Sequence, residues 1–307
     1  MAPGFEIIKL GDIPGMQTQD LNVGVIQESN LLGKLNRLKN ILADMGSAAV
    51  AFSGGVDSTF LLKVAHDVLG DKCIGIVALS ESYPPEEAEE ARGLARQIGA
   101  ECVFIETQEL QNEQYASNPT NRCYYCKKEL FAKMFEVAVS RGIKWLLYGA
   151  NADDLGDFRP GSQAAKEVNA RAPLVEAGIT KAEVRELSRR LGLPTWNKPA
   201  SACLASRVPY GTRITADILN RIASAERFLK QMGFNQVRVR HHSDIARIEV
   251  PREEFPRLLD GDAAAEIVSK LKELGYVYVT LDLQGFRSGS MNEVLRKEKL
   301  APTGAQQ

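Results

Sequence analysis

A short apolar strand, a glycine-rich turn and an amphipathic helix follow one another in the segment AVAFSGGVDSTFLLKVA, from Ala49 to Ala65. Strand and helix patterns then alternate along the chain. After the first helix, strand patterns occupy residues 73–80, 101–107 and 143–151, and helix patterns occupy 84–99, 128–142 and 180–192. Alternation of this kind is typical of βαβ units, so it predicts an α/β fold with a parallel sheet covered by helices on both faces.

The pattern changes after Pro199. A long amphipathic helix (216–233) is followed by two strand patterns around a polar turn (234–250), a helix (263–275) and a strand (276–283). This order predicts a second, smaller α+β domain. We therefore expect a first domain over residues 27–198 and a second over 199–300.

The start of the chain has weak periodicity and several Gly and Pro residues. We expect residues 1–26 to form a loosely ordered leader and a helix to run from Leu31 to Met45, where apolar residues recur at helical spacing. The leader lacks the basic-then-apolar order of a signal peptide. No apolar run reaches the length of a membrane span. These features predict a cytoplasmic protein without a membrane partner.

The formal net charge of the 307 residues is -1. This balance argues against a protein coated with positive charge for non-specific nucleic-acid binding. The five cysteines should stay reduced in the cytosol. Each cysteine therefore either packs in the core, binds a metal or takes part in the reaction.

The turn between the first strand and its helix has the composition of an anion site. Backbone N–H groups of the turn and of the helix N-terminus can bind phosphate, and glycines let the backbone approach it. The Ser53 and Ser58 hydroxyls can donate further hydrogen bonds, whereas the Asp57 carboxylate is suited to Mg²⁺. A Walker-type loop would carry a lysine, and this one has none.

A second loop, YGANADDLGDFRPG, follows the fourth strand pattern. Ligands of open α/β sheets lie outside the carboxyl ends of the strands. Gly149 could approach a nucleotide with its backbone, and Asp153, Asp154 and Asp157 could take part in metal binding, or could be solvated acids.

Three of the five cysteines are candidates for chemistry. Cys73 and Cys102 lie within apolar strand patterns, which predicts buried, inert thiols. Cys123 and Cys126 form a C-x-x-C pair at a helix start, where the helix dipole and nearby cations should lower the thiol pKa. The pair fits a redox couple, half of a zinc site or iron–sulfur ligands. Cys203 lies in a loop at the domain junction and either packs there or joins the pair as a third cluster ligand.

The hexapeptide SGGVDS resembles the pyrophosphate loop of N-type ATP pyrophosphatases, which include GMP synthetases, asparagine synthetases and tRNA thiolation enzymes. This resemblance implies the PP-loop, adenine nucleotide alpha hydrolase-like fold and cleavage of ATP between the α- and β-phosphates. It also assigns ATP binding to the loop residues Ser53, Gly54, Gly55, Val56, Asp57 and Ser58, and to Gly149.

The further segments RCYYCKKELF, NKPASACLASRVPYG, VRVRHHSDIARIEV and VTLDLQGFRSGSMN make the chain similar to the LarE family over about residues 32–296. The resemblance implies an ATP-dependent sulfurtransferase for nickel-pincer nucleotide biosynthesis, which matures lactate racemase. Such an enzyme adenylates a carboxylate of pyridinium-3,5-biscarboxylic acid mononucleotide, then forms a thiocarboxylate. The family tends to form homo-oligomers, and the sulfide donor is open.

Cys123, Cys126 and Cys203 together match the family subtype that holds sulfur on a [4Fe–4S] cluster. Asp57 and these cysteines are then the predicted catalytic residues. Alternation along VRVR places Arg238 and Arg240 on one strand face, and arginine can bind phosphate bidentately. We expect an anion pocket for the substrate near the junction, made by Arg207, Arg238, Arg240 and Arg287, with Glu226 on the long helix.

Three alternatives remain at this point. A cluster-dependent tRNA thiolation enzyme has a similar loop and cysteine set, although its two-thiocytidine type usually has Lys at the position of Val56. An amide-forming synthetase would need a glutaminase, and no cysteine triad for one is visible. A nucleotide sensor could use the C-x-x-C pair as a redox switch.

Overall fold

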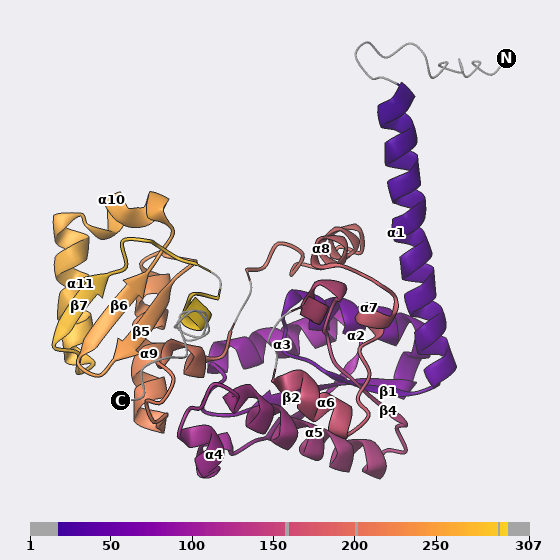
Figure 1. Cartoon of the computed structure of the whole chain (residues 1–307), viewed down its shortest axis with the longest axis horizontal. Helices are drawn as coiled ribbons and strands as arrows, with labels where there is room; N and C mark the ends of the chain where they lie inside the picture. The colour runs from indigo at the N-terminus through magenta and orange to yellow at the C-terminus, as the bar shows by residue number, and fades with distance from the viewer. Residues whose placement is uncertain (1–17, 157–159, 200–201, 288, 294–307) are drawn as a thin grey trace, which may run out of the picture.

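Four short parallel strands form the first sheet in the computed structural model of the protein (Figure 1). The structure describes residues 18–156, 160–199, 202–287 and 289–293. The strands are β1 (Ala48–Ala51), β2 (Cys73–Leu79), β3 (Glu101–Glu106) and β4 (Trp145–Leu147), in the order β3-β2-β1-β4. This order confirms the predicted parallel α/β sheet.

Helices cover both faces of this sheet because its strands alternate between two apolar clusters. Ala48 and Val50 of β1 pack with α1 (Thr18–Met45), α2 (Val56–Leu69), α3 (Pro85–Ile98) and α8 (Lys181–Arg190). Ala49 points the other way, towards α5 (Arg122–Ser140) and α6 (Gly161–Glu167). The short helices α4 (Glu113–Ala116) and α7 (Pro173–Glu176) complete this part.

Several predicted helix ends are confirmed by their local geometry. Gly70 and Gly99 follow α2 and α3 with positive φ angles of 56° and 84°. Such angles suit glycine because it has no Cβ. Thr180 and Glu183 form a capping box at the start of α8, within the predicted helix 180–192.

The first helix is longer than we predicted. It begins at Thr18, so residues 18–26, which we expected to be loosely ordered, are helical. Residues 1–17 of the predicted leader lie outside the described residues. The first turns of α1 stand away from the body of the protein in Figure 1.

A second sheet of three strands forms the predicted smaller α+β unit. Strands β5 (Arg238–His242) and β6 (Ile245–Glu249) pair antiparallel, and β7 (Tyr278–Leu281) pairs parallel with β6. Helices α9 (Ala216–Gln231) and α11 (Gly261–Glu273) pack on one face through an apolar cluster that includes Val239 and Ile248. The short α10 spans Phe255–Leu258.

The two sheet-containing parts meet through an apolar cluster of their own. Tyr115 of α4 packs with Leu204 and Ala205 of the short helix η4 (Leu204–Arg207) and with Leu219 and Ile222 of α9. Tyr125 and Cys126 of α5 pack against the same cluster. One of the candidate thiols therefore lies at the junction.

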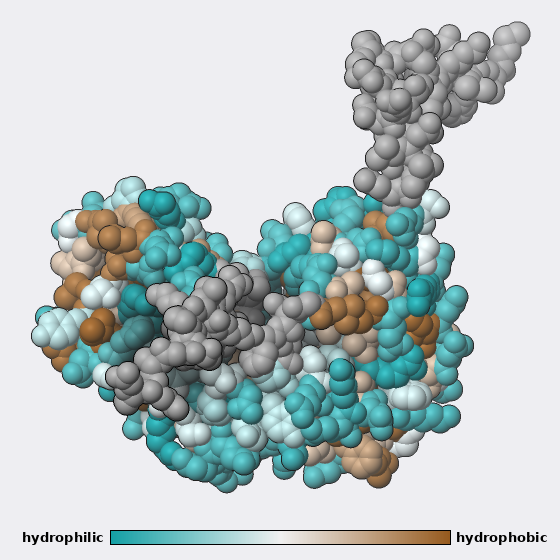
Figure 2. Space-filling model, in the orientation of Figure 1, coloured by the Kyte–Doolittle hydropathy of each residue, from teal (hydrophilic) through white to brown (hydrophobic). Residues whose placement is uncertain are grey.

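The coloured part of the face shown in Figure 2 is mostly hydrophilic, with small groups of exposed apolar side chains. Scattered apolar exposure of this kind is ordinary for folded proteins. Among the described helices, none combines the length and the apolar character needed to cross a membrane.

Candidate functional site

The glycine-rich turn between β1 and α2 is closed by its own hydroxyl groups. The Ser53 N–H donates to Ser58 Oγ at 3.2 Å, and Ser58 Oγ donates to the Gly55 carbonyl at 3.2 Å. Gly54 has a φ of +67°, and a Cβ there would lie 3.5 Å from Ala91. The positive φ favours glycine here, whereas the distance to Ala91 is an ordinary van der Waals contact.

The N-terminus of α2 in this turn remains open to an anion. Gly55 is its N-cap and offers no side-chain hydrogen bond, and the first helical bond runs from Thr59 N to the Gly55 carbonyl. The N–H groups before Thr59 precede that bond, so they are available to a phosphate. We expected the serine hydroxyls to bind phosphate as well, but in this structure they bond within the turn.

Asp57 is held by two side chains that the sequence analysis did not identify. Its carboxylate accepts hydrogen bonds from Lys181 Nζ and, at 3.3 Å, from Asn151 Nδ2. Lys181 is the first residue of α8 and lies 124 positions along the chain. A lysine therefore does reach this loop, from another helix. Nothing local in the sequence distinguishes Lys181 from an ordinary residue of a first helical turn.

Lys198 is a second lysine at the loop. Its Nζ donates to the Gly54 carbonyl at 3.2 Å and lies 2.8 Å from a carboxylate oxygen of Glu90. The residue belongs to the NKPASAC segment, which leads to Cys203. This segment therefore connects the PP-loop to the candidate thiols.

Gly149 contacts the loop itself. A Cβ at this position would lie 3.0 Å from Ser58 N and 3.2 Å from Ser58 Cα. Glycine is thus needed for the close approach of two backbones, whereas we had expected an approach to the nucleotide.

The acidic residues after Gly149 are engaged within the protein. The Asp153 carboxylate accepts a hydrogen bond from the Lys181 N–H at 2.9 Å, and Asp154 accepts one from the Asn151 N–H at 3.1 Å. These bonds position α8 and the loop, which is a different role from the metal binding that we considered. Asp157 lies outside the described residues.

The three candidate thiols lie in one neighbourhood. Cys123 and Cys126 occupy the first turns of α5, and Cys203 immediately precedes η4. Electrostatic interactions couple Cys203 to both of the other thiols. Cys126 Sγ donates to Glu109 Oε1 at 3.5 Å, and Glu109 is buried.

The expected lowering of the thiol pKa values is wrong. The residue Cys123 is exposed by surface area, but the protein groups packed around its thiol displace water and raise its pKa, and Cys203 raises it further. Burial and the Glu109 carboxylate raise the pKa of Cys126 well above its usual value. Removal from water disfavours the thiolate, and this effect outweighs the cations that the sequence places beside the pair.

The remaining cysteines behave as predicted. Burial raises the pKa of Cys73 to about 12 and that of Cys102 to about 11. Cys73 is buried and Cys102 is half-buried. Both thiols are therefore unreactive at neutral pH.

In general, three cysteine thiolates can ligate three irons of a four-iron cluster and leave the fourth iron open. Within the described ranges, no group of three or more His, Cys, Asp or Glu side chains converges tightly enough to hold a metal ion. A four-iron cluster presents a separate iron to each thiolate, so its ligands need not meet at one point. The donor chemistry of Cys123, Cys126 and Cys203 thus fits such a group.

Two of the predicted arginines are neutralised by buried carboxylates. Arg207 forms two hydrogen bonds to Glu226, at 2.8 and 3.0 Å, and Arg240 forms two to Glu249, at 2.9 and 3.0 Å. Glu226 also accepts from the Val239 N–H at 3.0 Å. These pairs connect α9, β5 and β6, and Glu249 is a partner that the sequence analysis missed.

The same arginines hold the segment that carries Cys203. Arg207 Nη1 donates to the Cys203 carbonyl at 3.2 Å, and Arg240 Nη1 donates to the Ser206 carbonyl at 2.6 Å. Both guanidinium groups therefore fix the position of the third thiol relative to the second sheet.

Arg238 differs from both because no carboxylate pairs with it among the residues that the structure describes. Its guanidinium stacks on Phe286 at 4.3 Å and donates to the Arg287 carbonyl at 3.1 Å. Burial, together with Arg207 and Arg240, lowers the pKa of Arg238 to about 10. A buried cation repelled by two others is poised to bind an anion. As predicted, Arg238 and Arg240 share the strand face opposite Val239, which packs in the helix-covered cluster.

Arg287 is less directly placed for a ligand. Its side chain lies 3.2 Å from Glu293 and 3.6 Å from Asp282. The backbone carbonyl of Arg287 accepts a hydrogen bond from Arg238, and this bond connects Arg287 to the predicted arginine group.

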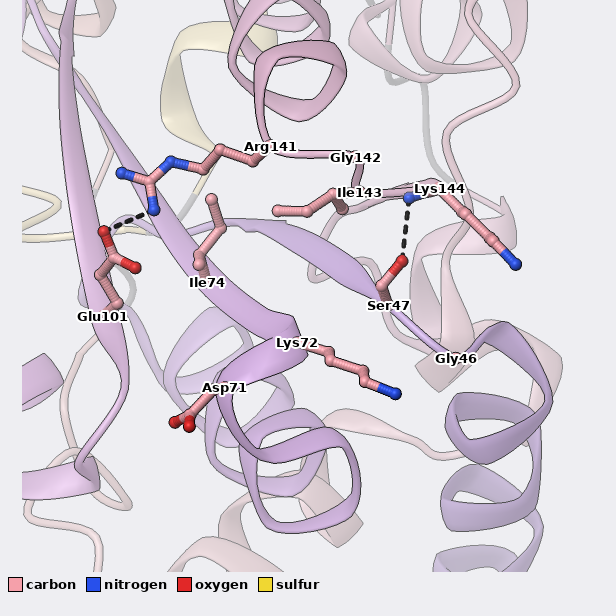
Figure 3. Close-up of a pocket in the computed structure, with 10 residues that line it drawn as sticks. All are labelled: Gly46, Ser47, Asp71, Lys72, Ile74, Glu101, Arg141, Gly142, Ile143 and Lys144. Carbon is pink, nitrogen blue, oxygen red and sulfur yellow. Dashed lines mark hydrogen bonds and ion pairs between the residues drawn. The ribbon is translucent and has the colours of Figure 1, made fainter.

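An open hollow of about 640 Å³ lies at the opposite edge of the first sheet (Figure 3). Its lining includes Ser47, Ile74 and Glu101, which stand at the amino ends of the strands, and Arg141 pairs with Glu101 at 2.6 Å. Ligands of parallel sheets bind at the carboxyl ends. The loop, the thiols and the arginines are therefore the better candidate site.

Comparisons with known proteins identify relatives over most of the chain. The chain is 46% identical to the protein slr1717 of Synechocystis over 267 residues, which is 87% of this chain and all of the relative. It is 41% identical to the pyridinium-3,5-bisthiocarboxylic acid mononucleotide synthase of Lactiplantibacillus plantarum over 274 residues, 89% of this chain and 99% of that protein. No protein-family model matches the chain.

A more distant similarity covers the PP-loop part. A glutamine-hydrolysing GMP synthase component of Archaeoglobus fulgidus is 30% identical over 162 residues, which is 48% of this chain and 52% of that protein. This relationship supports the PP-loop fold of an ATP-utilising enzyme family.

Proposed function

Since the chain belongs to the LarE family of pyridinium-3,5-bisthiocarboxylic acid mononucleotide synthases, we propose that it is an ATP-dependent sulfurtransferase. Its substrate is pyridinium-3,5-biscarboxylic acid mononucleotide, and its product is a thiocarboxylate for nickel-pincer nucleotide biosynthesis. The name of the Lactiplantibacillus plantarum relative supports the class of substrate, and the PP-loop supports the use of ATP.

The observation that carries the proposal is the segment between Lys198 and Arg207. Lys198 contacts the PP-loop, Cys203 carries a thiol, and Arg207 is bonded to Glu226 beneath β5. One stretch of chain thus connects an ATP site, a sulfur site and an arginine-rich face. A reaction that activates an acid with ATP and then delivers sulfur needs these three sites close together.

The first step is activation of the substrate carboxylate. A carboxylate oxygen attacks the α-phosphorus of ATP, and pyrophosphate leaves with the electron pair of the broken bond. Free N–H groups at the start of α2 stabilise the phosphates, and Lys181, which lies at the same loop, can contact the leaving group. Asp57 would hold Mg²⁺, which would supply positive charge to the phosphates. Arg238 binds the phosphate of the mononucleotide and thereby recovers the cost of its own burial.

The second step is sulfur transfer. A sulfur nucleophile attacks the carbonyl carbon of the adenylate, AMP leaves, and a thiocarboxylate remains. A [4Fe–4S] cluster held by Cys123, Cys126 and Cys203 would supply this sulfur from its open iron. Arg207 and Arg240 keep Cys203 in place for that purpose.

The proposal extends to the setting of the enzyme. We expect a cytoplasmic homo-oligomer, as the family resemblance implies. The near-neutral charge and the small-molecule substrate of the named relative support a function without nucleic acid.

An anaerobic assay tests the function. The iron- and sulfide-reconstituted protein is incubated with Mg-ATP and the mononucleotide, and separately with bulk tRNA, and the products are analysed by mass spectrometry. We expect AMP, pyrophosphate and a thiocarboxylate mononucleotide. Thiolated tRNA with an unchanged mononucleotide would instead identify a tRNA thiolation enzyme.

A further inference from the structure

Arg122 is a buried cation at the start of α5, next to Cys123. Arg122 is only 3% exposed. Within residues 18–156, 160–199, 202–287 and 289–293, no carboxylate pairs with its guanidinium group. Arg207 and Arg240, which are buried to a similar degree, each have a buried glutamate partner. An unpaired buried charge costs several kcal/mol, so the charge of Arg122 calls for a separate explanation.

The guanidinium group is held firmly by neutral groups. Nη1 donates to Asn118 Oδ1 at 2.7 Å, and Asn118 is itself fixed by hydrogen bonds to the carbonyls of Val208, Pro209 and Thr212. Among the described residues, Nη2 has only the weak acceptor Met291 Sδ, at 3.6 Å, and the buried Nε has no partner. Most donors of a rigid, fully charged group are thus left for a ligand.

One aromatic ring lies beside both this cation and the thiols. The guanidinium carbon of Arg122 is 5.0 Å from the centre of the Tyr210 ring. Burial raises the pKa of Tyr210, Arg122 opposes the rise, and Cys123 and Cys203 add to it. Arg122 and Cys123 are the first two residues of α5, so this charge lies close to the thiol, at a helix N-terminus whose N-cap Asn121 makes no capping hydrogen bond through its side chain.

We propose that Arg122 is an anion-recognition residue of the thiol site, which binds a small monovalent anionic group beside Cys123. Two groups of the proposed reaction have this chemistry. One is a carboxylate of the substrate, and the other is inorganic hydrosulfide. The choice of these two ligands rests on the proposed function, whereas anion binding by Arg122 does not.

Alkylation of Cys123 in the full-length, metal-free protein tests the proposal. Iodoacetate and iodoacetamide are similar in size, but only iodoacetate is an anion. The rate of alkylation by iodoacetate divided by the rate with iodoacetamide therefore reports anion recognition at the thiol. Peptide mass spectrometry identifies the modified cysteine. We expect Arg122→Gln to lower the ratio about tenfold at low salt, as loss of one nearby charge predicts, and Arg122→Lys to retain most of it.

Arg141→Gln is the matched control. It removes the same charge at the other end of α5, where Arg141 pairs with Glu101. An unchanged ratio in Arg122→Gln, or an equal fall in Arg141→Gln, would overturn the proposal. Circular dichroism checks that each variant is folded.

A second measurement uses the unmodified protein, in case Arg122→Gln does not fold. Bromide, an anion close to hydrosulfide in size, and pyridine-3,5-dicarboxylate are compared as inhibitors of iodoacetate labelling at constant ionic strength. Stronger protection by the dicarboxylate assigns the site to the substrate, and stronger protection by bromide assigns it to inorganic sulfur. Protection by neither refutes anion binding. The experiment needs no ATP or mononucleotide, so its failure is distinguishable from a failure of the proposed function.

Discussion

Lys181 shows how a single residue can supply what a local motif lacks. The turn from Ser53 to Ser58 has no lysine of its own, and α8 delivers one to Asp57. In the free protein the two charges neutralise each other. In the proposed reaction, Asp57 would hold Mg²⁺ and the ammonium group of Lys181 would serve the phosphates, as the lysine of a Walker loop does.

Replacement of Lys181 by Met should therefore slow pyrophosphate release about a hundredfold, because one cation that stabilises the departing phosphates is lost. Lys63→Met is the control, since Lys63 forms only an exposed pair with Asp67 along α2. Its rate should stay within about twofold of the wild-type rate, because exposed helical pairs contribute little. Equal rates in the two variants would remove Lys181 from the mechanism.

The thiols show the limit of reasoning from neighbouring residues. The C-x-x-C pair, its helix start and its adjacent cations are all visible in the sequence. Glu109 and Cys203, which act on Cys126 in the opposite direction, approach it only in the folded chain. Burial is also a property of the whole fold, so the direction of the pKa shift could not be obtained from the local pattern.

At the scale of elements, local signals were sufficient wherever the residues that form an element also determine its ends. The capping box of α8 and the glycines after α2 and α3 are examples. The start of α1 was missed because residues 18–26 have weak apolar periodicity, although they are helical. Packing between elements was hidden as well, as the contact of Gly149 with Ser58 illustrates.

This contact makes a prediction about stability. Gly149→Ala would place a Cβ 3.0 Å from Ser58 N, so it should destabilise the protein by about 1–3 kcal/mol and weaken ATP binding. Gly93→Ala is a matched change within α3, where nothing lies within 4 Å. It should stabilise the protein by about 0.5–1 kcal/mol, because alanine favours a helix. Urea unfolding of both variants measures whether each change raises or lowers the free energy of unfolding. A Gly149→Ala variant as stable as Gly93→Ala would show that the two backbones are not tightly packed.

At the scale of the molecule, the predicted division into an α/β part and a smaller α+β part agrees with the two sheets. The sequence also identified the strand face of Arg238 and Arg240. It did not reveal that Arg240 is paired with Glu249 while Arg238 is unpaired in the described residues, because this difference depends on the register of β5 against β6. Such pairings determine which arginine remains available to a ligand.

The Arg207–Glu226 pair should contribute strongly to the junction. Glu226→Gln leaves a buried arginine without its counter-charge, so we expect a loss of about 3–5 kcal/mol in the free energy of unfolding. Glu113→Gln breaks an exposed pair with Arg213 and should leave the free energy of unfolding nearly unchanged, because solvent screens such pairs. Denaturant titration compares the variants. Similar losses would contradict a buried role for Glu226.

The ten residues from Lys198 to Arg207 also limit the distance between the loop and the third thiol. Even a fully extended chain keeps the Cα atoms of Lys198 and Cys203, five residues apart, within about 18 Å. In the proposed reaction, this short connection keeps the thiol of Cys203 in the neighbourhood of an adenylate made at the loop. A reactive acyl phosphate can then be consumed before it escapes into water, and no separate carrier protein is needed between the two steps.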